Sequence, residues 1–153
     1  GNIVVGNVGT ANRLDYTAIG DPVNVASRIE LLNKYYGTKI IISESTYEKV
    51  KNLFVTRELD TVMVKGKSES IIIYELIDYI DNVEKEYLEL ISLFGQGLKC
   101  YKARNWKKAL EYFNSALKIK KDAPSLLMVE RCKKFIANPP NDDWNGIHIF
   151  NNK

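Results

Sequence analysis

The N-terminal part of the chain alternates between apolar runs and turn-forming residues. Apolar and β-branched residues dominate Asn2–Val8, and a second such run covers Leu14–Ile19. Gly9–Asn12 separates the two runs with residues that favour turns. The pattern predicts two strands joined as a hairpin.

A helix is predicted directly after this hairpin. Asp21 suits the N-cap, Pro22 suits the first helical position, and Gly37 is expected to end the helix. Between them, apolar side chains recur at the spacing of one buried helix face. These side chains are Val25, Ile29, Leu32 and Tyr36.

Strands and helices continue to alternate as far as residue 78. A short apolar strand is expected over Lys39–Ile42, followed by a helix that Ser43 can cap and that runs to about Val50. Two further strands are expected over Arg57–Val64 and Ile71–Ile77. Strands mixed with helices, with a hairpin at each end, favour an α/β or α+β sandwich over an all-β fold.

After Asp78 the apolar pattern becomes helical to the end of the chain. Two stripes at helical spacing predict two helices, separated at Asn105, which is expected to cap the second. A third helix is expected from Pro124 to Ala137, because two prolines follow it. Trp144 is expected to anchor the tail. The change of pattern divides the chain into residues 1–78 and residues 79–153.

The helix pair over Leu93–Leu117 resembles a tetratricopeptide repeat. Small and aromatic residues stand where that helix–turn–helix unit places them, namely Gly97, Ala109, Phe113 and Ala116. One such unit is visible, and the usual proline comes a few positions late, at Pro124. The tail is therefore expected to be a repeat-like helical hairpin.

Composition and charge are those of an ordinary globular protein. Of 153 residues, 45% are hydrophobic and 27% are charged, and the net charge of +3 is spread along the chain. A nucleic-acid-binding protein would show a denser basic stripe. Cys100 and Cys132 match no metal-ligand spacing and are expected to be reduced thiols in a cytoplasmic protein. No stretch approaches the roughly 20 apolar residues that span a bilayer, although a longer parent chain could still be anchored in a membrane.

Four polar residues are candidates for a nucleotide site. Asn24 and Arg28 are one helical turn apart, so their side chains leave the same face. The guanidinium of Arg28 suits phosphate oxygens, and the amide of Asn24 suits a ribose. Thr17 offers a hydroxyl to a purine edge, and Lys65 in its glycine-containing turn offers a cation to a triphosphate. Taken singly, each residue also suits an ordinary structural role on a helix surface, strand or turn.

The order of the motifs carries more information than any single residue. The segments GNIVVGNVGT, DYTAIGDPVNVASRIE, IIISESTY and VKGKSESIIIYEL follow one another within the first 76 residues. This order resembles the C-terminal half of a class III nucleotide cyclase catalytic domain. Its most specific part is the run GD-x-VN-x-A-x-R, followed by VKGK. The resemblance implies a ferredoxin-like α/β sandwich that acts as a homodimer and binds its nucleotide between subunits.

The same resemblance implies a role for each candidate residue. Asn24 would orient the ribose, and Arg28 would stabilise charge on the α-phosphate in the transition state. Lys65 would bind the terminal phosphates. Thr17 falls where the family reads the purine, and threonine there favours ATP over GTP. The implied reaction converts ATP to 3′,5′-cyclic AMP and pyrophosphate, with Mg²⁺ or Mn²⁺ as the cofactor.

One part of the family's site has no counterpart in this chain. Its metal-binding aspartates and purine-contacting lysine precede the position of Gly1, and Asp15, Asp21 and Asp60 do not replace them. We therefore expect a C-terminal fragment of an adenylate cyclase that is inactive alone and holds no metal. Two alternatives stay open. One is a guanylate cyclase, and the other is a non-catalytic module whose helical tail binds a protein partner.

Overall fold

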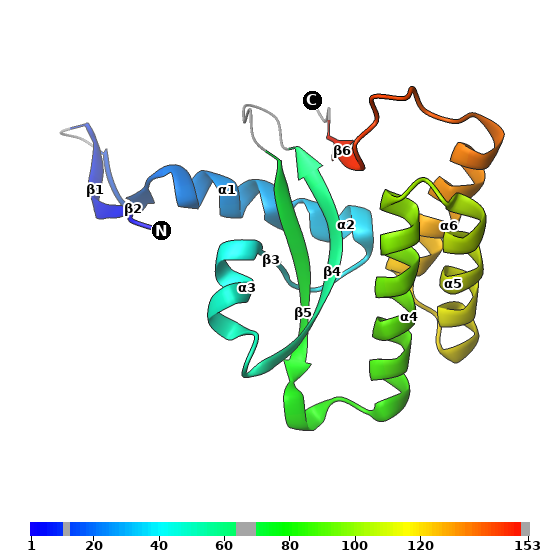
Figure 1. The fold of residues 1–153 in the computed structure, drawn as a ribbon. Helices are drawn as coiled ribbons and strands as arrows, with labels where there is room; N and C mark the ends of the chain where they lie inside the picture. The colour runs from blue at the N-terminus through cyan, green and yellow to red at the C-terminus, as the bar shows by residue number, and fades with distance from the viewer. Residues whose placement is uncertain (11–12, 64–69, 151–153) are drawn as a thin grey trace.

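In the computed structural model of the chain, which describes residues 1–10, 13–63 and 70–150, the first two apolar runs form an antiparallel hairpin. Strand β1 (Val4–Thr10) pairs with β2 (Arg13–Ile19), and Gly6 lies opposite Thr17. The hairpin projects from one end of the molecule, as Figure 1 shows. The predicted hairpin is confirmed.

The predicted helix is present but is interrupted at Leu31. Helix α1 (Asp21–Glu30) is followed at once by α2 (Leu32–Tyr36), and the N-cap of α1 is Gly20 instead of Asp21. Gly37 ends α2 in the left-handed region, with φ 69° and ψ 32°. A side chain there would be strained, and its Cβ would lie 2.5 Å from the Cβ of Ala123.

A four-stranded sheet forms the centre of the molecule, in the order β3-β5-β4-β6. The strands β4 (Phe54–Met63) and β5 (Ile71–Tyr79) are antiparallel, and β3 (Ile41–Ser43) lies against the other side of β5. Helix α3 (Glu44–Val50) follows β3, as the sequence predicts. The fourth strand, β6 (Ile147–Ile149), comes from the C-terminal tail and runs parallel to β4. The sequence did not predict β6, because a three-residue strand carries almost no periodic signal.

The C-terminal part is helical, as predicted. A 3₁₀ turn (Ile80–Asn82) leads into α4 (Lys85–Lys102), α5 (Trp106–Ile119) and α6 (Ala123–Ala137). The Asn105 side chain accepts a hydrogen bond from the Lys108 amide at 3.3 Å, so the predicted cap is confirmed. A Cβ added to Gly97 would lie 2.7 Å from the Phe113 ring, which explains why this position of α4 carries no side chain. Membership of the tetratricopeptide class stays a prediction.

The tail is anchored as expected. The Trp144 ring packs edge-on against Tyr101 and Phe135, with centroids 5.4 and 5.3 Å apart. Arg104, from the turn between α4 and α5, donates hydrogen bonds to the carbonyl oxygens of Pro140 and Asn141. These contacts hold the chain after α6 in place and lead it back to the sheet.

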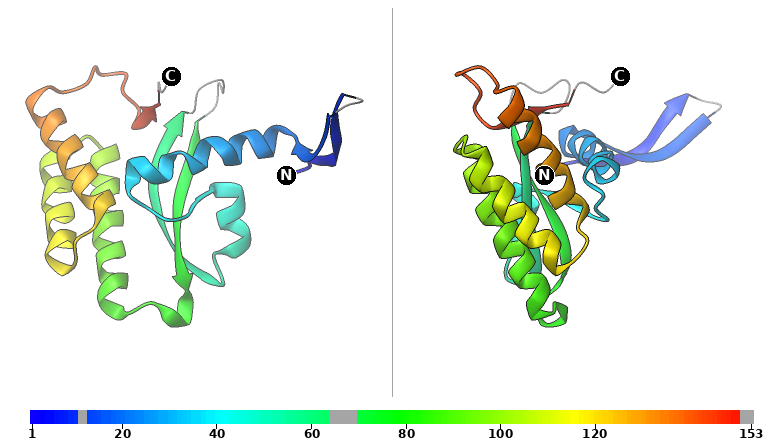
Figure 2. Two further views of the ribbon diagram at one scale, coloured as in Figure 1. Left: turned by 180° about the vertical axis from the view of Figure 1, so that it is seen from behind. Right: turned by 90° about the vertical axis from the view of Figure 1, so that its right-hand side faces the viewer.

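One buried cluster runs through both parts of the chain. It joins Ile29 and Leu59 of the mixed part to Phe94 and Met128 of the helical part. The views from front and back agree that α4–α6 lie on the side of the sheet opposite the hairpin (Figures 1 and 2). The α+β prediction is confirmed. The division at residue 78 marks the change from mixed to helical structure, and as a domain boundary it stays a prediction.

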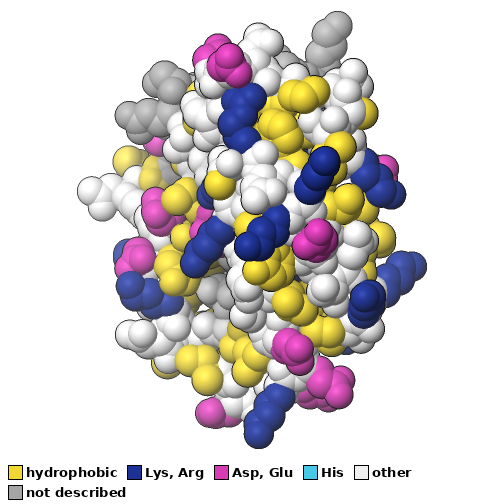
Figure 3. Space-filling view, turned by 45° about the vertical axis from the view of Figure 1, so that its right-hand side comes forward, with side chains coloured by type: hydrophobic (Ala, Val, Ile, Leu, Met, Phe, Trp, Pro, Cys, Tyr) yellow, Lys and Arg dark blue, Asp and Glu magenta, His cyan; other side chains and the backbone are white. Residues whose placement is uncertain are grey.

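The surface is mixed in character. On the face drawn in Figure 3, Lys and Arg side chains are interspersed with Asp, Glu and hydrophobic side chains. Within the described part of the chain, every helix is too short or too polar to cross a membrane.

Candidate functional site

The exposed face of α1 carries the two central candidate residues. Asn24 is exposed and Arg28 is half-buried, one turn further along the helix. Within residues 1–10, 13–63 and 70–150, neither side chain has a hydrogen bond or an ion pair. A guanidinium and an amide without partners in this part of the chain can meet an anionic, hydroxyl-bearing ligand.

Thr17 lies on the strand that leads into this helix. Its side chain is exposed on β2, and Gly20 turns the chain from β2 into α1. Thr17 and Asn24 therefore lie on either side of one tight turn. Asn24 is fixed to that turn through its backbone amide, which donates to the Gly20 carbonyl oxygen at 3.3 Å. No hydrogen bond or ion pair joins Thr17, Asn24 and Arg28 to one another.

Lys65 lies outside the described residues. Its predicted role in binding phosphates stays a prediction.

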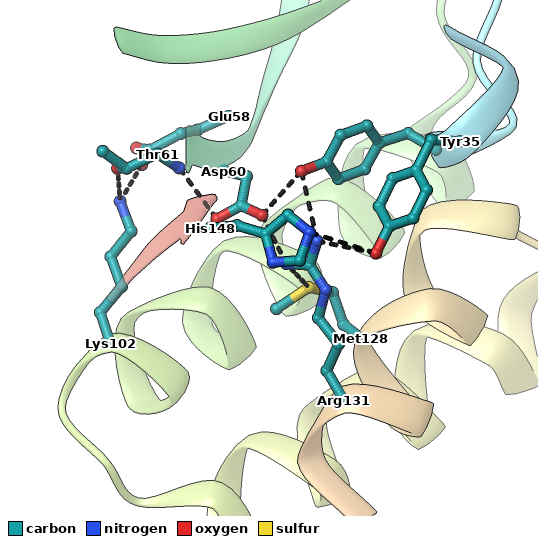
Figure 4. A network of polar contacts seen from close by, with 9 residues as sticks. Tyr35, Glu58, Asp60, Thr61, Lys102, Met128, Arg131 and His148 are labelled. Carbon is teal, nitrogen blue, oxygen red and sulfur yellow. Dashed lines mark hydrogen bonds and ion pairs between the residues drawn. The ribbon is translucent and has the colours of Figure 1, made fainter. Parts of the chain in front are cut away.

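Sequence reasoning missed a buried polar network at the far end of the α1–α2 segment (Figure 4). Arg131 of α6 forms an ion pair with Asp60 of β4, and the Tyr36 hydroxyl donates to the same Asp60 oxygen at 2.7 Å. The other Asp60 oxygen accepts from the Thr61 amide at 2.9 Å. The sequence gives one indication of this network. Arg131 directly precedes the buried Cys132, so a charged side chain lies within an apolar helical pattern.

A second arginine links the sheet to the helical part. Arg57 of β4 binds Asp122 at the start of α6 with both terminal nitrogens, at 2.9 and 3.0 Å. Its Nε also donates to Glu75 of β5 at 3.0 Å. Asp122 in turn caps α6 by accepting from the Ser125 amide at 2.9 Å. The paired geometry satisfies a charge that burial would otherwise make costly.

Burial and charge shift the pKa values of these groups in consistent directions. Burial raises the pKa of the Tyr36 hydroxyl, and the Asp60 carboxylate raises it further. Burial opposes the charge of Arg131, but Asp60 outweighs it and the pKa of Arg131 lies above its usual value. Burial, with the positive charge of Arg131, lowers the pKa of His148 from 6.5 to about 4. The network therefore holds a charged Arg131, a neutral Tyr36 and a neutral His148 at neutral pH.

The described residues do not fit a divalent-metal centre. In residues 1–10, 13–63 and 70–150, no three His, Cys, Asp or Glu side chains come close enough to hold an ion. The fully buried carboxylate, Asp60, is already bound by Arg131 and Tyr36. Mg²⁺ prefers free carboxylate oxygens, so this donor set does not by itself form a magnesium site.

Comparison with known proteins places the first half of the chain in a family. Residues 1–78 match the family described as adenylate and guanylate cyclase catalytic domain. A Dictyostelium discoideum protein named adenylate cyclase, terminal-differentiation specific, is 41% identical over 138 residues, which cover 86% of this chain and 6% of that protein. The Anabaena cylindrica adenylate cyclase is 52% identical over 82 residues, covering 50% of this chain and 16% of that protein.

Among solved structures, the adenylyl cyclase CyaB from P. aeruginosa is 35% identical with a TM-score of 0.45. The match covers 54% of this chain and 41% of the CyaB chain.

These matches differ in how much of the chain they cover. The Dictyostelium similarity covers 86% of this chain, which is more than residues 1–78 contain. It therefore extends into the helical part. The chain spans 16% or less of the length of these two curated relatives.

Proposed function

Because the chain belongs to the adenylate and guanylate cyclase catalytic domain family, we propose that it supplies the nucleotide-contacting half of an adenylate cyclase site. As part of a longer chain, that site converts ATP to 3′,5′-cyclic AMP and pyrophosphate. The observation that carries the proposal is the exposed face of α1, where Asn24 and Arg28 stand together without partners among the described residues. The names of the two curated relatives support ATP as the substrate class.

In the proposed reaction the ribose 3′-hydroxyl gives up its proton to water, and its oxygen attacks the α-phosphorus. A new P–O bond forms there, and the bond to the pyrophosphate oxygen breaks, so pyrophosphate leaves. Negative charge builds up on the α-phosphate oxygens as this happens, and the fixed cation of Arg28 stabilises it. Asn24 orients the ribose through its amide, which both donates and accepts hydrogen bonds.

Substrate contacts at the two ends of the nucleotide complete the proposal. Thr17 contacts the purine from β2, and Lys65 binds the terminal phosphates. A hydroxyl both donates and accepts, so Thr17 alone discriminates weakly between adenine and guanine. Guanylate cyclase is therefore the second candidate, and the family's description includes it.

The proposed site is completed by a second subunit. Cyclases of this family use a divalent metal, and the ligands for Mg²⁺ or Mn²⁺ are proposed to lie in a metal-binding half outside these 153 residues. When bound, the metal neutralises phosphate charge. In a dimer, Arg28 of one subunit and the metal-binding half of the other would then face the same ATP.

A mixed-subunit assay tests this proposal. A full-length relative is made inactive by replacing its residue aligned with Arg28 by alanine, and the present chain is added with Mn²⁺ and ATP. We expect no cyclic AMP from either protein alone and measurable cyclic AMP from the mixture. Turnover by the present chain alone would contradict the proposed division of the site, and the absence of rescue would contradict the proposed role of the chain. Replacing ATP by GTP in the mixture distinguishes the two candidate substrates.

A further inference from the structure

The α1–α2 segment is held at one end by the helical part of the chain. Tyr36, the last residue of α2, is 1% exposed and donates to Asp60, which is fully buried. Arg131 of α6 binds the same carboxylate and donates to the Tyr36 hydroxyl at 3.4 Å. The terminal nitrogen of Arg131 that donates to Tyr36 also donates to the Tyr35 hydroxyl at 3.3 Å. One guanidinium therefore connects α6, β4 and α2 (Figure 4).

The other end of the same segment carries the nucleotide-facing residues. One residue, Leu31, separates α1 from α2, and Ile29 and Leu32 on either side of it are buried in the common core. Arg28 is eight positions before Tyr36, or about 12 Å along a helix. Leu31 itself keeps right-handed helical backbone angles, with φ −59° and ψ −24°, so α2 continues the direction of α1 without a sharp turn.

We propose that Arg131 is a positioning residue for the nucleotide site. It fixes Tyr36 against Asp60 and thereby sets the place of Arg28 and Asn24 on α1. The helical part of the chain then helps to position the site, because α6 supplies this arginine. The inference rests on the proposed function for its catalytic consequence, but its structural half does not depend on activity.

The chain contains a matched control for this inference. Arg57 is also a buried arginine that links the sheet to α6, through Asp122 and Glu75. Unlike Arg131, it makes no hydrogen bond to α1 or α2 among the described residues. Arg57→Met and Arg131→Met therefore remove the same chemical group from similar surroundings, but only Arg131→Met removes hydrogen bonds to Tyr35 and Tyr36 of α2.

Amide hydrogen exchange on the complete chain provides the test. In Arg131→Met we expect the amides of residues 21–36 to exchange about tenfold faster than in the unmodified chain, the size of a typical coupling between sites. In Arg57→Met these amides should keep their rates, although both variants lower the melting temperature. Equal rates over residues 21–36 in the two variants would overturn the inference.

Two milder variants keep the test decisive if Arg131→Met does not fold. Tyr36→Phe removes one hydroxyl and keeps the ring, and it should accelerate exchange over residues 21–36 by a smaller factor. Arg131→Lys keeps the positive charge but loses the forked donors, so it should fall between the unmodified chain and Arg131→Met. Unchanged rates over residues 21–36 in Tyr36→Phe would contradict the role given to this contact.

The mixed-subunit assay adds a functional readout. Arg131→Met should lower kcat, because Arg28 acts in the transition state, and should leave KM for ATP nearly unchanged. Arg131→Lys should recover part of kcat. An equal loss of kcat in Arg57→Met would indicate a general loss of structure and contradict the positioning role. If the unmodified chain gives no rescue, the proposed function fails, while the exchange rates still decide whether Arg131 holds α1.

Discussion

The two ends of this molecule use polar side chains in opposite ways. At the hairpin end, Asn24 and Arg28 stand on an exposed helix face, and no described residue binds their side chains. At the helical end, Arg57 and Arg131 are buried and paired with carboxylates. Unpaired polar groups on a surface are available to a ligand, whereas paired polar groups in a core fix the backbone around them. The hairpin end therefore has the features of a site, and the helical end those of its support.

Hydrophobic residues show the same contrast. Val4 and Tyr16 of the hairpin are 73% and 75% exposed, whereas Phe94 and Phe113 of the helical part are fully buried. Substitutions at the two ends should therefore differ sharply in their effect on stability.

The largest loss of stability is expected from Asp60→Ala. The substitution leaves the guanidinium of Arg131 buried without its carboxylate, which costs about 3–5 kcal/mol of unfolding free energy. Urea denaturation followed by circular dichroism measures the loss. A change below 1 kcal/mol would show that the buried pair does not support the fold.

A smaller loss is expected from Gly97→Ala. The added Cβ would lie 2.7 Å from the Phe113 ring, so α4 and α5 must move apart, at a cost of about 1–3 kcal/mol. Gly95, in the same helix, has open space around the corresponding position, and Gly95→Ala serves as the matched control. The control should be neutral or stabilising, because alanine favours the helix. Equal effects in the two variants would argue against close packing at Gly97.

Acid should weaken the helical end through His148. Its pKa is lowered to about 4 in the folded protein from an ordinary value of 6.5, so the unfolded chain binds the proton more readily. The contribution of neutral His148 to the unfolding free energy is fully present above pH 6.5 and is lost as the pH falls toward 4. His148→Gln should reduce the pH dependence of the melting temperature within that window, since histidine occurs once in the chain. An identical pH profile for the variant would contradict the pKa shift.

The smallest effect is expected at the hairpin end. Tyr16→Ala removes a side chain that is 75% exposed, so the unfolding free energy should change by about 0.5 kcal/mol or less. A loss comparable to that of Gly97→Ala would contradict the contrast between the two ends.

The sequence predicted local structure better than long-range contacts. Gly37 and Asn105 ended and began helices where expected, because each acts through its own backbone neighbourhood. The break at Leu31 was missed, since the apolar stripe continues through it. Strand β6 was also missed, because its partner β4 is more than 80 residues away in the sequence.

In the candidate site, too, the local arrangement could be predicted and the long-range contacts could not. Helical spacing placed Asn24 and Arg28 on one face of α1, and that placement needs no tertiary information. Arg131 and Asp60, by contrast, are 71 positions apart, and no local rule pairs them. The sequence offers Asp60 only as a metal ligand that does not fit, because the fold alone brings Arg131 to it.

The central claim is that Arg28 acts on the nucleotide from a site that the rest of the chain holds in place. The most direct test is the rate of cyclic AMP formation in the mixed-subunit assay, with Arg28→Ala in the present chain. We predict that kcat falls by a factor on the order of 10²–10³, as when one transition-state donor is removed, while the melting temperature stays unchanged. If the Arg28→Ala chain restores activity as well as the unmodified chain, the proposed role of Arg28 is wrong.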